Sequence, residues 1–388
     1  MERRKFIANT AAAAAFPFIP KINLSSSGNS NDIEELLHKH LPVNFTRDGL
    51  NLSPTLYAKL LEQLTLDDDF QPDSYGLGGM IHQFEEKVAL ALGKEKAIYM
   101  PTGTLANHIA LRKHCISKNR AIVQYESHIN RDSGDCATTL SGINLISLGG
   151  KNVIYNLDEL KYFLEDNSHG KVKTPIGVLS LETPMRRKGL QRIPFGDIEK
   201  IANVAKENGI ALHLDGARLY IDAAFSGKDI KEYTKLFDTV YLSMYKSFNS
   251  VNGAILAGST AFIEGLHNER RMFGGGLPSS WQQIVIANYF FDNYTIRYSK
   301  ALQQFDVFKS LLEKSGKFKI SALKNGSSVF KLMPNSSINS EQLKINMDKN
   351  QIFLPNLNKA DMCFYIKIND SLVYNDMQEL ANVFLSNC

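Results

Sequence analysis

Short apolar runs alternate with segments of helical periodicity through the middle of the chain. The runs that we interpret as strands cover residues 96–100, 121–125, 144–148, 176–181, 210–214, 239–244 and 253–258. Several are followed by stretches with apolar residues every three or four positions, among them 104–114, 157–166 and 195–208. Near-continuous apolar strands that alternate with helices are typical of a mostly parallel sheet covered on both faces. The pattern therefore predicts an α/β fold with a large, mostly parallel seven-stranded sheet.

The pattern changes after a long helical stretch at residues 281–312. Strand-like runs at 327–332 and 362–368 then alternate with helical segments near 341–349 and 376–385. Strands and helices of this kind predict a smaller α+β domain. We therefore divide the chain into a large domain with an N-terminal arm at residues 31–290 and a small C-terminal domain at residues 291–388.

The first thirty residues differ from the rest. Arg3 and Arg4 precede an alanine-rich stretch at 10–19 and a serine-rich stretch at 25–31. A charged segment, an apolar segment and a flexible linker in this order are typical of an export leader, and the paired arginines resemble a twin-arginine signal. We interpret residues 1–30 as leader and linker, which predicts a periplasmic location. The alternative is a cytoplasmic protein with a basic tail that forms a short helix.

Composition limits the classes of partner. Hydrophobic residues make up 44% and charged residues 22% of the chain, and the formal net charge is +4 at pH 7, as in an ordinary globular protein. The charge is too small and too scattered for a nucleic-acid partner, and no apolar run is long enough to span a bilayer. The cysteines, at 115, 136, 363 and 388, form no Cys-x-x-Cys pair. We therefore predict no zinc ribbon, no other metal site and no disulfide framework.

A charged residue follows each of two predicted strands. Asp215 follows the strand at 210–214 directly, and Lys246 follows the strand at 239–244. An ionised carboxylate at the end of a buried strand is costly unless a partner or ligand meets it. In such sheets ligands bind beyond the carboxyl ends of the strands. We therefore expect Asp215 and Lys246 to face one shared ligand at that edge.

A third feature follows the strand at 96–100. Thr102 and Thr104 offer hydroxyls, Gly103 lets the backbone approach closely, and the helix that begins here offers free N–H groups. An N-capping threonine is also common for structural reasons alone. An anion cradle, a carboxylate and a lysine together meet the needs of the phosphate, ring nitrogen and aldehyde of pyridoxal 5′-phosphate (PLP). The combination predicts PLP as cofactor.

Five segments carry a specific resemblance. They are 73–76 (Asp-Ser-Tyr-Gly), 101–107 (Pro-Thr-Gly-Thr-Leu-Ala-Asn), 126–129 (Glu-Ser-His-Ile), 213–219 (His-Leu-Asp-Gly-Ala-Arg-Leu) and 270–276 (Arg-Arg-Met-Phe-Gly-Gly-Gly). In this order they resemble the threonine aldolases of the aromatic amino acid β-eliminating lyase/threonine aldolase family. The resemblance runs from about residue 73 to residue 283. It implies a PLP-dependent transferase-like architecture of fold type I.

The resemblance also implies catalytic roles. Lys246 is expected to hold the cofactor, Asp215 to pair with its ring nitrogen, and Arg218 to bind the substrate carboxylate. His128 is expected to stack on the ring and to act as base, directly or through a water.

The predicted cofactor-binding set is larger. Besides His128, Asp215 and Lys246, it contains Thr102, Gly103, Thr104, Ser243 and Arg271, of which Arg271 is expected near the phosphate. His213 lies within an apolar strand and is interpreted as a core residue.

The chain departs from the family pattern at several places: besides two that bear directly on the site, residues 277–279 (Leu-Pro-Ser) lack an arginine of the family's glycine run, and Lys188-Gly189 stand where the family has paired glycines. Residues 247–253 (Ser-Phe-Asn-Ser-Val-Asn-Gly) stand where the family has a glycine-rich turn after the lysine. The family also places a carboxylate-binding arginine in the small domain, whereas residues 330–388 contain no arginine. Two interpretations stay open. Either Arg218 holds the carboxylate with other help, from Lys188 or a neighbouring subunit, or the substrate is not threonine.

The function implied by the resemblance is cleavage of the Cα–Cβ bond of a β-hydroxy-α-amino acid. Substrates of the L-threonine or L-allo-threonine type would give glycine and an aldehyde. The alternatives are a PLP-dependent β-eliminating lyase or aminotransferase that acts on another amino acid, and a non-catalytic binding protein on this fold. The resemblance further implies a homodimer or homotetramer whose ligand is a small amino acid.

Overall fold

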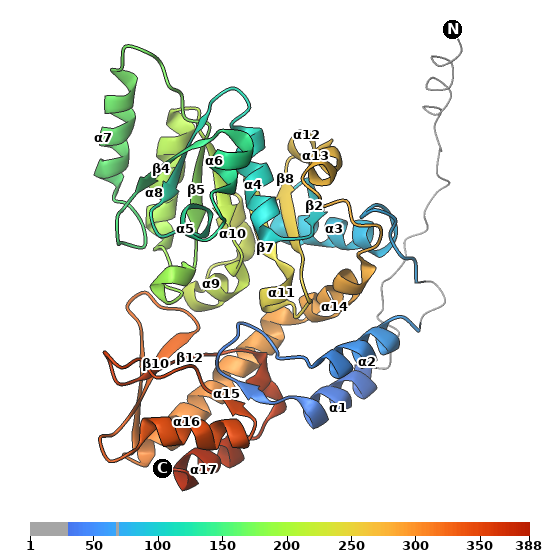
Figure 1. Ribbon diagram of the computed structural model, residues 1–388, viewed down its shortest axis with the longest axis vertical. Coiled ribbons are helices and arrows are strands. Elements are labelled where there is room, and N and C mark those ends of the chain that lie inside the picture. The colour runs from blue at the N-terminus through green and yellow to red at the C-terminus, as the bar shows by residue number, and fades with distance from the viewer. Residues whose placement is uncertain (1–29, 67–69) are drawn as a thin grey trace.

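The structure is a computed structural model that describes residues 30–66 and 70–388 of the 388-residue chain (Figure 1). The predicted leader, with Arg3 and Arg4, lies outside the described residues. None of the helices in the described ranges is both long and apolar enough to cross a membrane.

A seven-stranded sheet forms the centre of the large domain. Its strands are β2 (Lys96–Met100), β3 (Arg120–Gln124), β4 (Asn144–Leu148), β5 (Val178–Glu182), β6 (Ala211–Asp215), β7 (Thr239–Ser243) and β8 (Ala254–Gly258). They lie in the order β2-β8-β7-β6-β5-β3-β4. Strand β8 runs antiparallel to both of its neighbours, and the other pairs are parallel. The seven predicted strands are all present, and the mostly parallel α/β sheet is confirmed.

Helices pack against this sheet, and their sequences explain where they form. They are α3 (Gly79–Leu92), α4 (Gly103–His114), α5 (His128–Arg131), α6 (Cys136–Ser141), α7 (Leu157–Ser168), α8 (Phe195–Glu207), α9 (Leu219–Ser226), α10 (Ile230–Thr234), α11 (Met244–Ser247), α12 (Thr260–Ile263), α13 (Leu266–Met272) and α14 (Trp281–Asp292). Helix α3 buries Ile81, Phe84, Val88 and Leu92, which share one helical face. It ends at Gly93 in the left-handed conformation, which glycine adopts readily. Helix α4 packs across β6, β7 and β8.

The C-terminal part has its own sheet and its own apolar core. Strands β9 (Phe318–Ala322), β10 (Val329–Pro334) and β12 (Phe364–Lys367) are antiparallel in the order β12-β10-β9. The surrounding helices are α15 (Tyr294–Lys314), α16 (Ser340–Lys349), α17 (Met377–Ser386) and the 3-10 turn η2 (Asp370–Tyr374). The sequence predicted β10, β12, α16 and α17 but not β9. The long helical stretch at 281–312 is broken at Asn293, so that α14 and α15 are separate helices.

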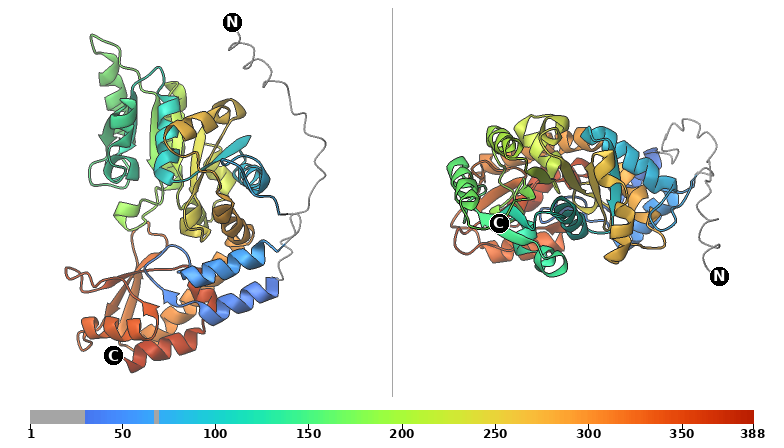
Figure 2. Two further views of the ribbon diagram at one scale, coloured as in Figure 1. Left: turned by 45° about the vertical axis from the view of Figure 1, so that its right-hand side comes forward. Right: turned by 90° about the horizontal axis from the view of Figure 1, so that it is seen from above.

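The N-terminal arm connects the two parts. Helix α1 (Ser30–His40) precedes β1 (Val43–Asn44) in the chain, and α2 (Pro54–Leu64) follows it. Strand β1 pairs in parallel with β11 (Ile352–Phe353). Phe45 stacks on Phe308 of α15, with ring centroids 5.7 Å apart. Figures 1 and 2 show this blue arm beside the red C-terminal part, below the large sheet. The arm thereby brings residues 46–51 next to the carboxyl edge of β7.

Candidate active site

The predicted site residues gather at one edge of the large sheet. Strands β2, β5, β6 and β7 are mutually parallel, because β8 reverses direction between β2 and β7. Their carboxyl ends therefore share an edge, at which β6 ends in Asp215 and β7 ends in Ser243. Helix α4 begins directly after β2, and α11 directly after β7. This topology brings Lys246 and the 102–104 segment to the same edge as Asp215.

Lys246 carries a reactive amine. It lies in the short helix α11, partly buried, and within the described residues its amine makes no hydrogen bond or ion pair. Burial, together with the positive charge of Arg218, lowers the pKa of Lys246 to about 8. About a tenth of this amine is therefore uncharged at pH 7, far more than for a lysine of ordinary pKa, and a nucleophilic lysine requires this uncharged form.

Asp215 is held firmly at the strand end. One of its carboxylate oxygens, Oδ2, accepts a hydrogen bond of 2.6 Å from the side-chain amide of Asn107. The other, Oδ1, accepts one of 3.2 Å from the backbone N–H of Ala217. The side chain is buried, and each oxygen keeps a further lone pair for a cationic ligand. The sequence did not predict the contact with Asn107.

His128 begins α5, and its environment favours the neutral imidazole. Its Nε2 lies 3.4 Å from the hydroxyl of Thr104, and burial lowers the pKa of the ring. Its backbone N–H donates to the buried carboxyl of Glu182 at 2.6 Å, and that of Arg186 donates to the same group at 2.9 Å. Burial first, and the nearby charge of Asp215 second, raise the pKa of Glu182 to about 7. Glu182, which the sequence did not single out, thus fixes the position of His128.

The 102–104 segment has the geometry of an anion cradle. Thr102 caps α4, because its hydroxyl accepts from the N–H of Leu105 at 3.2 Å. A Cβ atom at Gly103 would lie 2.0 Å from the hydroxyl of Tyr241, so only glycine fits beneath this turn. The buried hydroxyl of Ser243 has no hydrogen-bond partner in the described part of the chain. The N–H groups of the first turn of α4 and the hydroxyl of Ser243 are donors that can bind an anionic group at the start of α4.

The two neighbouring arginines of the 270–276 segment have different surroundings. Arg270 is buried and donates to the backbone carbonyls of Tyr99, Tyr75 and Gly76 at 2.8–3.2 Å, so it supports the loops structurally. Arg271 is exposed, and its guanidinium lies 5.0 Å from the centre of the Tyr75 ring. Arg271 therefore keeps its donors available for a ligand, and its contact with the phosphate stays a prediction.

Arg218 is part of an ion-pair group that the sequence did not predict. Its Nη2 donates to Asp48 of the arm at 2.8 Å, and Lys367 of β12 donates to the other oxygen of Asp48 at 3.0 Å. The Nε of Arg218 is buried and has no partner among the described residues. Lys367 is thus a cation of the small domain that shares Asp48 with Arg218, and the sequence did not single it out.

Asp48 gives a testable dependence of stability on pH. Burial alone would raise the pKa of Asp48, but the charges of Arg218 and Lys367 lower it well below its usual value. A carboxyl whose pKa is lower in the folded state stabilises the fold above its unfolded pKa, and this contribution is lost as the pH falls. We expect Asp48→Asn to reduce the free energy of unfolding at pH 7 by about 3 kcal/mol, because the buried Arg218 and the partly buried Lys367 both lose their partner. The difference from wild type should narrow progressively below about pH 4.

Urea unfolding of both proteins at pH 7, 5, 4 and 3 measures this difference. The other carboxylates titrate in both proteins, so their contribution cancels. Lys344→Met is a suitable control, because the ion pair of Lys344 with Asp348 lies on the surface of α16 and is worth little. A difference between wild type and Asp48→Asn that stays constant from pH 7 to pH 3 would contradict the assignment.

The unusual segment 247–253 holds the arm in place. The side-chain oxygen of Asn249 accepts from the N–H of Leu50 at 2.7 Å. Ser250 donates to the carbonyl of Gln283 at 3.0 Å. A Cβ atom at Gly49 would lie 2.3 Å from Asn249 and 2.5 Å from the carbonyl of Lys246, so the arm passes very close to this turn. The departure from the family's turn therefore has a structural consequence: it fastens the arm to the segment that carries Lys246.

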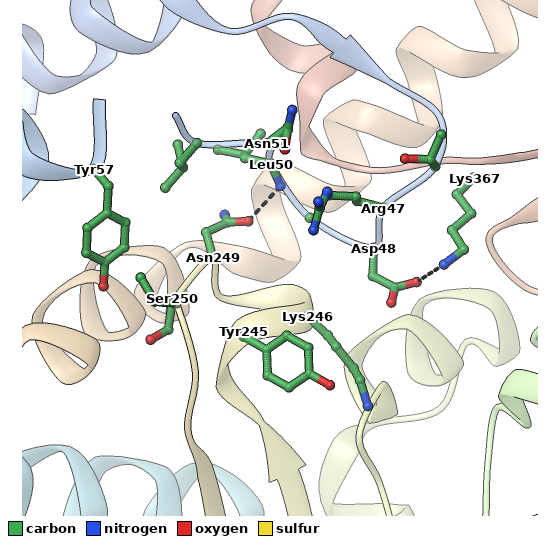
Figure 3. Close-up of a pocket in the computed structure, with 14 residues that line it drawn as sticks. Arg47, Asp48, Leu50, Asn51, Tyr57, Tyr245, Lys246, Asn249, Ser250 and Lys367 are labelled. Carbon is green, nitrogen blue, oxygen red and sulfur yellow. Dashed lines mark hydrogen bonds and ion pairs between the residues drawn. The ribbon is translucent and has the colours of Figure 1, made fainter. Parts of the chain in front are cut away.

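A cavity of about 390 Å³ opens where the arm, α11 and β12 meet. Figure 3 shows Asp48 and Lys367 on one side of it, Tyr57 on the other, and Tyr245 beside Lys246. Asp215, His128 and the 102–104 segment do not line this cavity. Lys246 therefore lies between two regions, the cavity beside the arm and the sheet edge at which Asp215 and the cradle lie.

The site residues fit PLP on the geometry alone. The amine of Lys246 is unpaired among the described residues, Asp215 has lone pairs to spare, and the buried hydroxyl of Ser243 lacks a partner near the start of α4. An amine, an acid and an anion cradle on a mostly parallel sheet define a fold-type I architecture suited to PLP. Comparison with known proteins supports this class. The chain matches the family described as Beta-eliminating lyase over residues 56–366, and it belongs to that family.

Individual relatives carry related names. The chain is 30% identical over 259 residues to the low specificity L-threonine aldolase of Saccharomyces cerevisiae, a match that covers 65% of each chain. It is also 30% identical over 200 residues to "Alanine racemase TOXG" of Cochliobolus carbonum, a match that covers 50% of this chain and 49% of that one. A putative L-allo-threonine aldolase from Listeria monocytogenes has a similar structure, with a TM-score of 0.71 and 28% identity over 92% of this chain and 99% of that one.

The matched stretches span between about half and two thirds of the length of the curated relatives. The match to the Listeria structure is more complete, and it includes the small domain. These matches establish the family and the fold of the chain.

Proposed function

We propose that this protein is a PLP-dependent lyase that cleaves the Cα–Cβ bond of a β-hydroxy-α-amino acid of the L-threonine or L-allo-threonine type. The observation that carries the proposal is Lys246. Its amine has a pKa lowered to about 8 and lies at the sheet edge where Asp215 and the α4 cradle meet. Bound PLP would supply an electron sink for the electrons of the broken bond.

The chain's own residues would hold the cofactor at three points. The amine of Lys246 suits the aldehyde, and the carboxylate of Asp215 suits the ring nitrogen. The phosphate suits the N-terminus of α4, with Thr102, Gly103, Thr104, Ser243 and Arg271 around it. The strand ends at Asp215 and Ser243 and the starts of α4 and α11 support this arrangement, because they share one edge of the large sheet.

Arg218 and His128 would act on the substrate. The Nε of Arg218, which has no partner among the residues that the structure describes, is a donor for the substrate carboxylate. Holding that carboxylate fixes which bond of Cα is aligned for cleavage. The neutral imidazole of His128, or a water that it holds, would accept the proton of the β-hydroxyl. Burial favours this neutral form because it lowers the pKa of His128.

Product analysis tests the reaction. With PLP and L-threonine or L-allo-threonine, the purified protein is expected to release glycine and acetaldehyde in equal amounts. D-Threonine and L-serine serve as controls for stereochemistry and for the size of the released aldehyde. If the protein binds PLP but forms no glycine from any β-hydroxy-α-amino acid, the proposed reaction is wrong.

A second candidate is β-elimination or amino transfer on another amino acid. It is favoured by the family's description as Beta-eliminating lyase. Pyruvate and ammonia without glycine would support elimination, and a keto acid without free ammonia would support amino transfer. A protein that takes up no PLP would instead support a non-catalytic binding role.

We propose a homodimer or homotetramer as the assembly. Tyr75, Leu77 and Met272 are large apolar side chains that are 44–61% exposed, and Tyr75 lies against Arg271 of the proposed phosphate site. Exposed large apolar side chains of this kind support an interface between subunits. Light scattering of the purified protein measures the assembly, and a monomer at micromolar concentration would contradict it.

We propose a periplasmic location, on the basis of Arg3 and Arg4 in the first thirty residues. The double variant Arg3→Lys, Arg4→Lys is expected to stay in the cytoplasm while wild type reaches the periplasm, because the twin-arginine route requires the arginine pair. Cell fractionation with immunoblotting measures both. Lys5→Arg is a control that changes a neighbouring basic residue. If wild type stays in the cytoplasm to the same extent as the double variant, the proposal is contradicted.

A further inference from the structure

A continuous line of buried polar groups runs beneath α4, from the sheet edge at Asp215 towards the opposite end of the strands. Asn107 donates to Asp215, and Oδ1 of Asn107 lies 2.9 Å from Nε2 of His213. Nδ1 of His213 lies 2.9 Å from the hydroxyl of Thr239 at the start of β7, which in turn lies 3.0 Å from Nε2 of His114. Asn107 and His114 are seven residues apart and therefore share one face of α4.

These groups are enclosed in an otherwise apolar interface. Asn107, His213 and Thr239 are at most 1% exposed. Burial lowers the pKa of His213 to about 3 and that of His114 to about 4, so both rings are neutral near pH 7. Burying a polar group costs free energy unless the group is hydrogen-bonded. Asn107, His213 and Thr239 each have a hydrogen-bond partner on both sides.

The donor of every hydrogen bond in the line can be derived. Asp215 only accepts, so the side-chain NH₂ of Asn107 must face it and Oδ1 of Asn107 must face His213. That oxygen only accepts, so Nε2 of His213 carries the proton. A neutral ring then leaves Nδ1 of His213 as an acceptor, and the hydroxyl of Thr239 donates to it. The hydroxyl oxygen of Thr239 then accepts from Nε2 of His114, so every donor in the line points towards Asp215.

We propose that Asn107, His213 and Thr239 form a one-directional hydrogen-bond relay whose role is to position and polarise Asp215 for the ring nitrogen of PLP. The inference rests on the cofactor of the proposed function. It concerns residues that contact Asp215 directly or through one another, so they are positioning residues. Hydrogen bonds that point the same way strengthen one another. The relay also fixes the plane of the carboxylate, because Asn107 and the N–H of Ala217 hold its two oxygens separately.

Asn107→Leu is the first variant, because leucine has a similar volume and cannot donate. It is expected to weaken PLP binding by the apo-protein roughly 10- to 100-fold, as is typical of the loss of a buried hydrogen bond to a charged group. Equilibrium dialysis measures this affinity without any turnover. Ser141→Ala is the matched control: Ser141 lies 2.7 Å from Nε2 of His108, another buried histidine, but is not part of the line. It should leave PLP affinity unchanged.

Substitutions of His213 separate the relay from simple packing. The amide of His213→Gln can donate to Asn107 from a position similar to Nε2, whereas His213→Leu fills the space without a donor. We expect His213→Gln to retain PLP affinity within roughly threefold of wild type, and His213→Leu to approach the loss of Asn107→Leu. Equal losses in both variants would show that only the shape of the ring matters and would overturn the relay.

The direction of the relay has a spectroscopic test that needs no cofactor. Solid-state ¹⁵N NMR of histidine-labelled apo-protein should show His213 with a proton on Nε2 and none on Nδ1, with His213→Gln assigning the signal by its loss. Thr239→Val should increase the other tautomer. A proton on Nδ1 in wild type would overturn the relay. If wild type binds no PLP the proposed function fails as well, whereas equal PLP affinity of wild type and Asn107→Leu would overturn the relay alone.

Discussion

Replacing Lys246 with alanine is expected to abolish the covalent retention of PLP and to lower lyase turnover by roughly 10⁴-fold or more, as for the loss of other covalent catalytic groups. The amine is the group that suits the cofactor aldehyde, and within the described residues it has no ion pair that would be broken. Borohydride reduction followed by peptide mass analysis should place the cofactor on Lys246 in wild type and find none in the variant.

Lys246→Arg is the matched control for charge. It keeps a cation at the same position of α11 but removes the nucleophilic amine, because arginine is not deprotonated in proteins. Both variants should lose the trapped cofactor, and both should keep the thermal stability of wild type. Trapped cofactor in Lys246→Ala at the wild-type level would show that another lysine holds it, and the site would then be wrongly assigned.

The pKa of Lys246 gives the same prediction a dependence on pH. Burial, and then the charge of Arg218, lower this pKa to about 8. Capture of PLP by the apo-protein needs the uncharged amine, so its rate should rise with pH and level off above about pH 8. Stopped-flow absorbance measures this rate. A rate that still rises steeply at pH 10 would indicate a lysine with an ordinary pKa.

The large sheet could be predicted from the sequence because its strands are almost uniformly buried. Strands β5, β7 and β8 are buried at every position, and such strands appear in the sequence as uninterrupted apolar runs. Strand β9 was missed for the opposite reason. Its Lys319 is exposed and its Ser321 is partly buried, so Phe318 and Ile320 alternate with polar residues over a span too short to stand out.

The candidate site was predicted where its residues are local and missed where they are distant. Asp215, Lys246 and the 102–104 segment each follow a predicted strand directly, so the topology of the sheet brings them together. Asp48 and Lys367 are in contact although 319 positions separate them in the sequence, and no pattern in either segment predicts this contact. The absence of arginine from residues 330–388 did signal a change in the carboxylate site, but the structure was needed to identify Lys367 as the cation beside Asp48.

Asn107 and His213 show a third case. Both lie in segments that carry the resemblance, and Asn107 and His114 have the spacing of one helical face. That spacing is also typical of apolar contacts with a sheet, so it does not indicate a polar line. The interpretation of His213 as a core residue agrees with its complete burial, and the structure adds the partners on both ring nitrogens.

Asp215→Asn has the second-largest expected effect, and it should differ in kind from the loss of Lys246. The amide keeps the size of the side chain but removes the negative charge that suits a protonated ring nitrogen. We expect turnover to fall by roughly 10²- to 10³-fold, as for the loss of one preorganised electrostatic contact. The cofactor should still be trapped on Lys246 by borohydride, because the amine is intact. Steady-state kinetics with L-threonine and the trapping assay together measure both effects.

Asp222→Asn separates loss of this charge from loss of any buried carboxylate. Asp222 is as deeply buried as Asp215, but it accepts from Tyr233 at 2.8 Å and from Thr183, and no predicted cofactor contact touches it. Burial raises the pKa of Asp222 to about 6, so this carboxyl is still largely ionised at pH 7, and the amide removes a buried negative charge that lies away from the predicted cofactor contacts. We expect Asp222→Asn to keep turnover within a few-fold of wild type. If Asp215→Asn were equally active, the ring nitrogen would need no anionic partner in this protein, and the electrostatic role of the β6 strand end would be excluded.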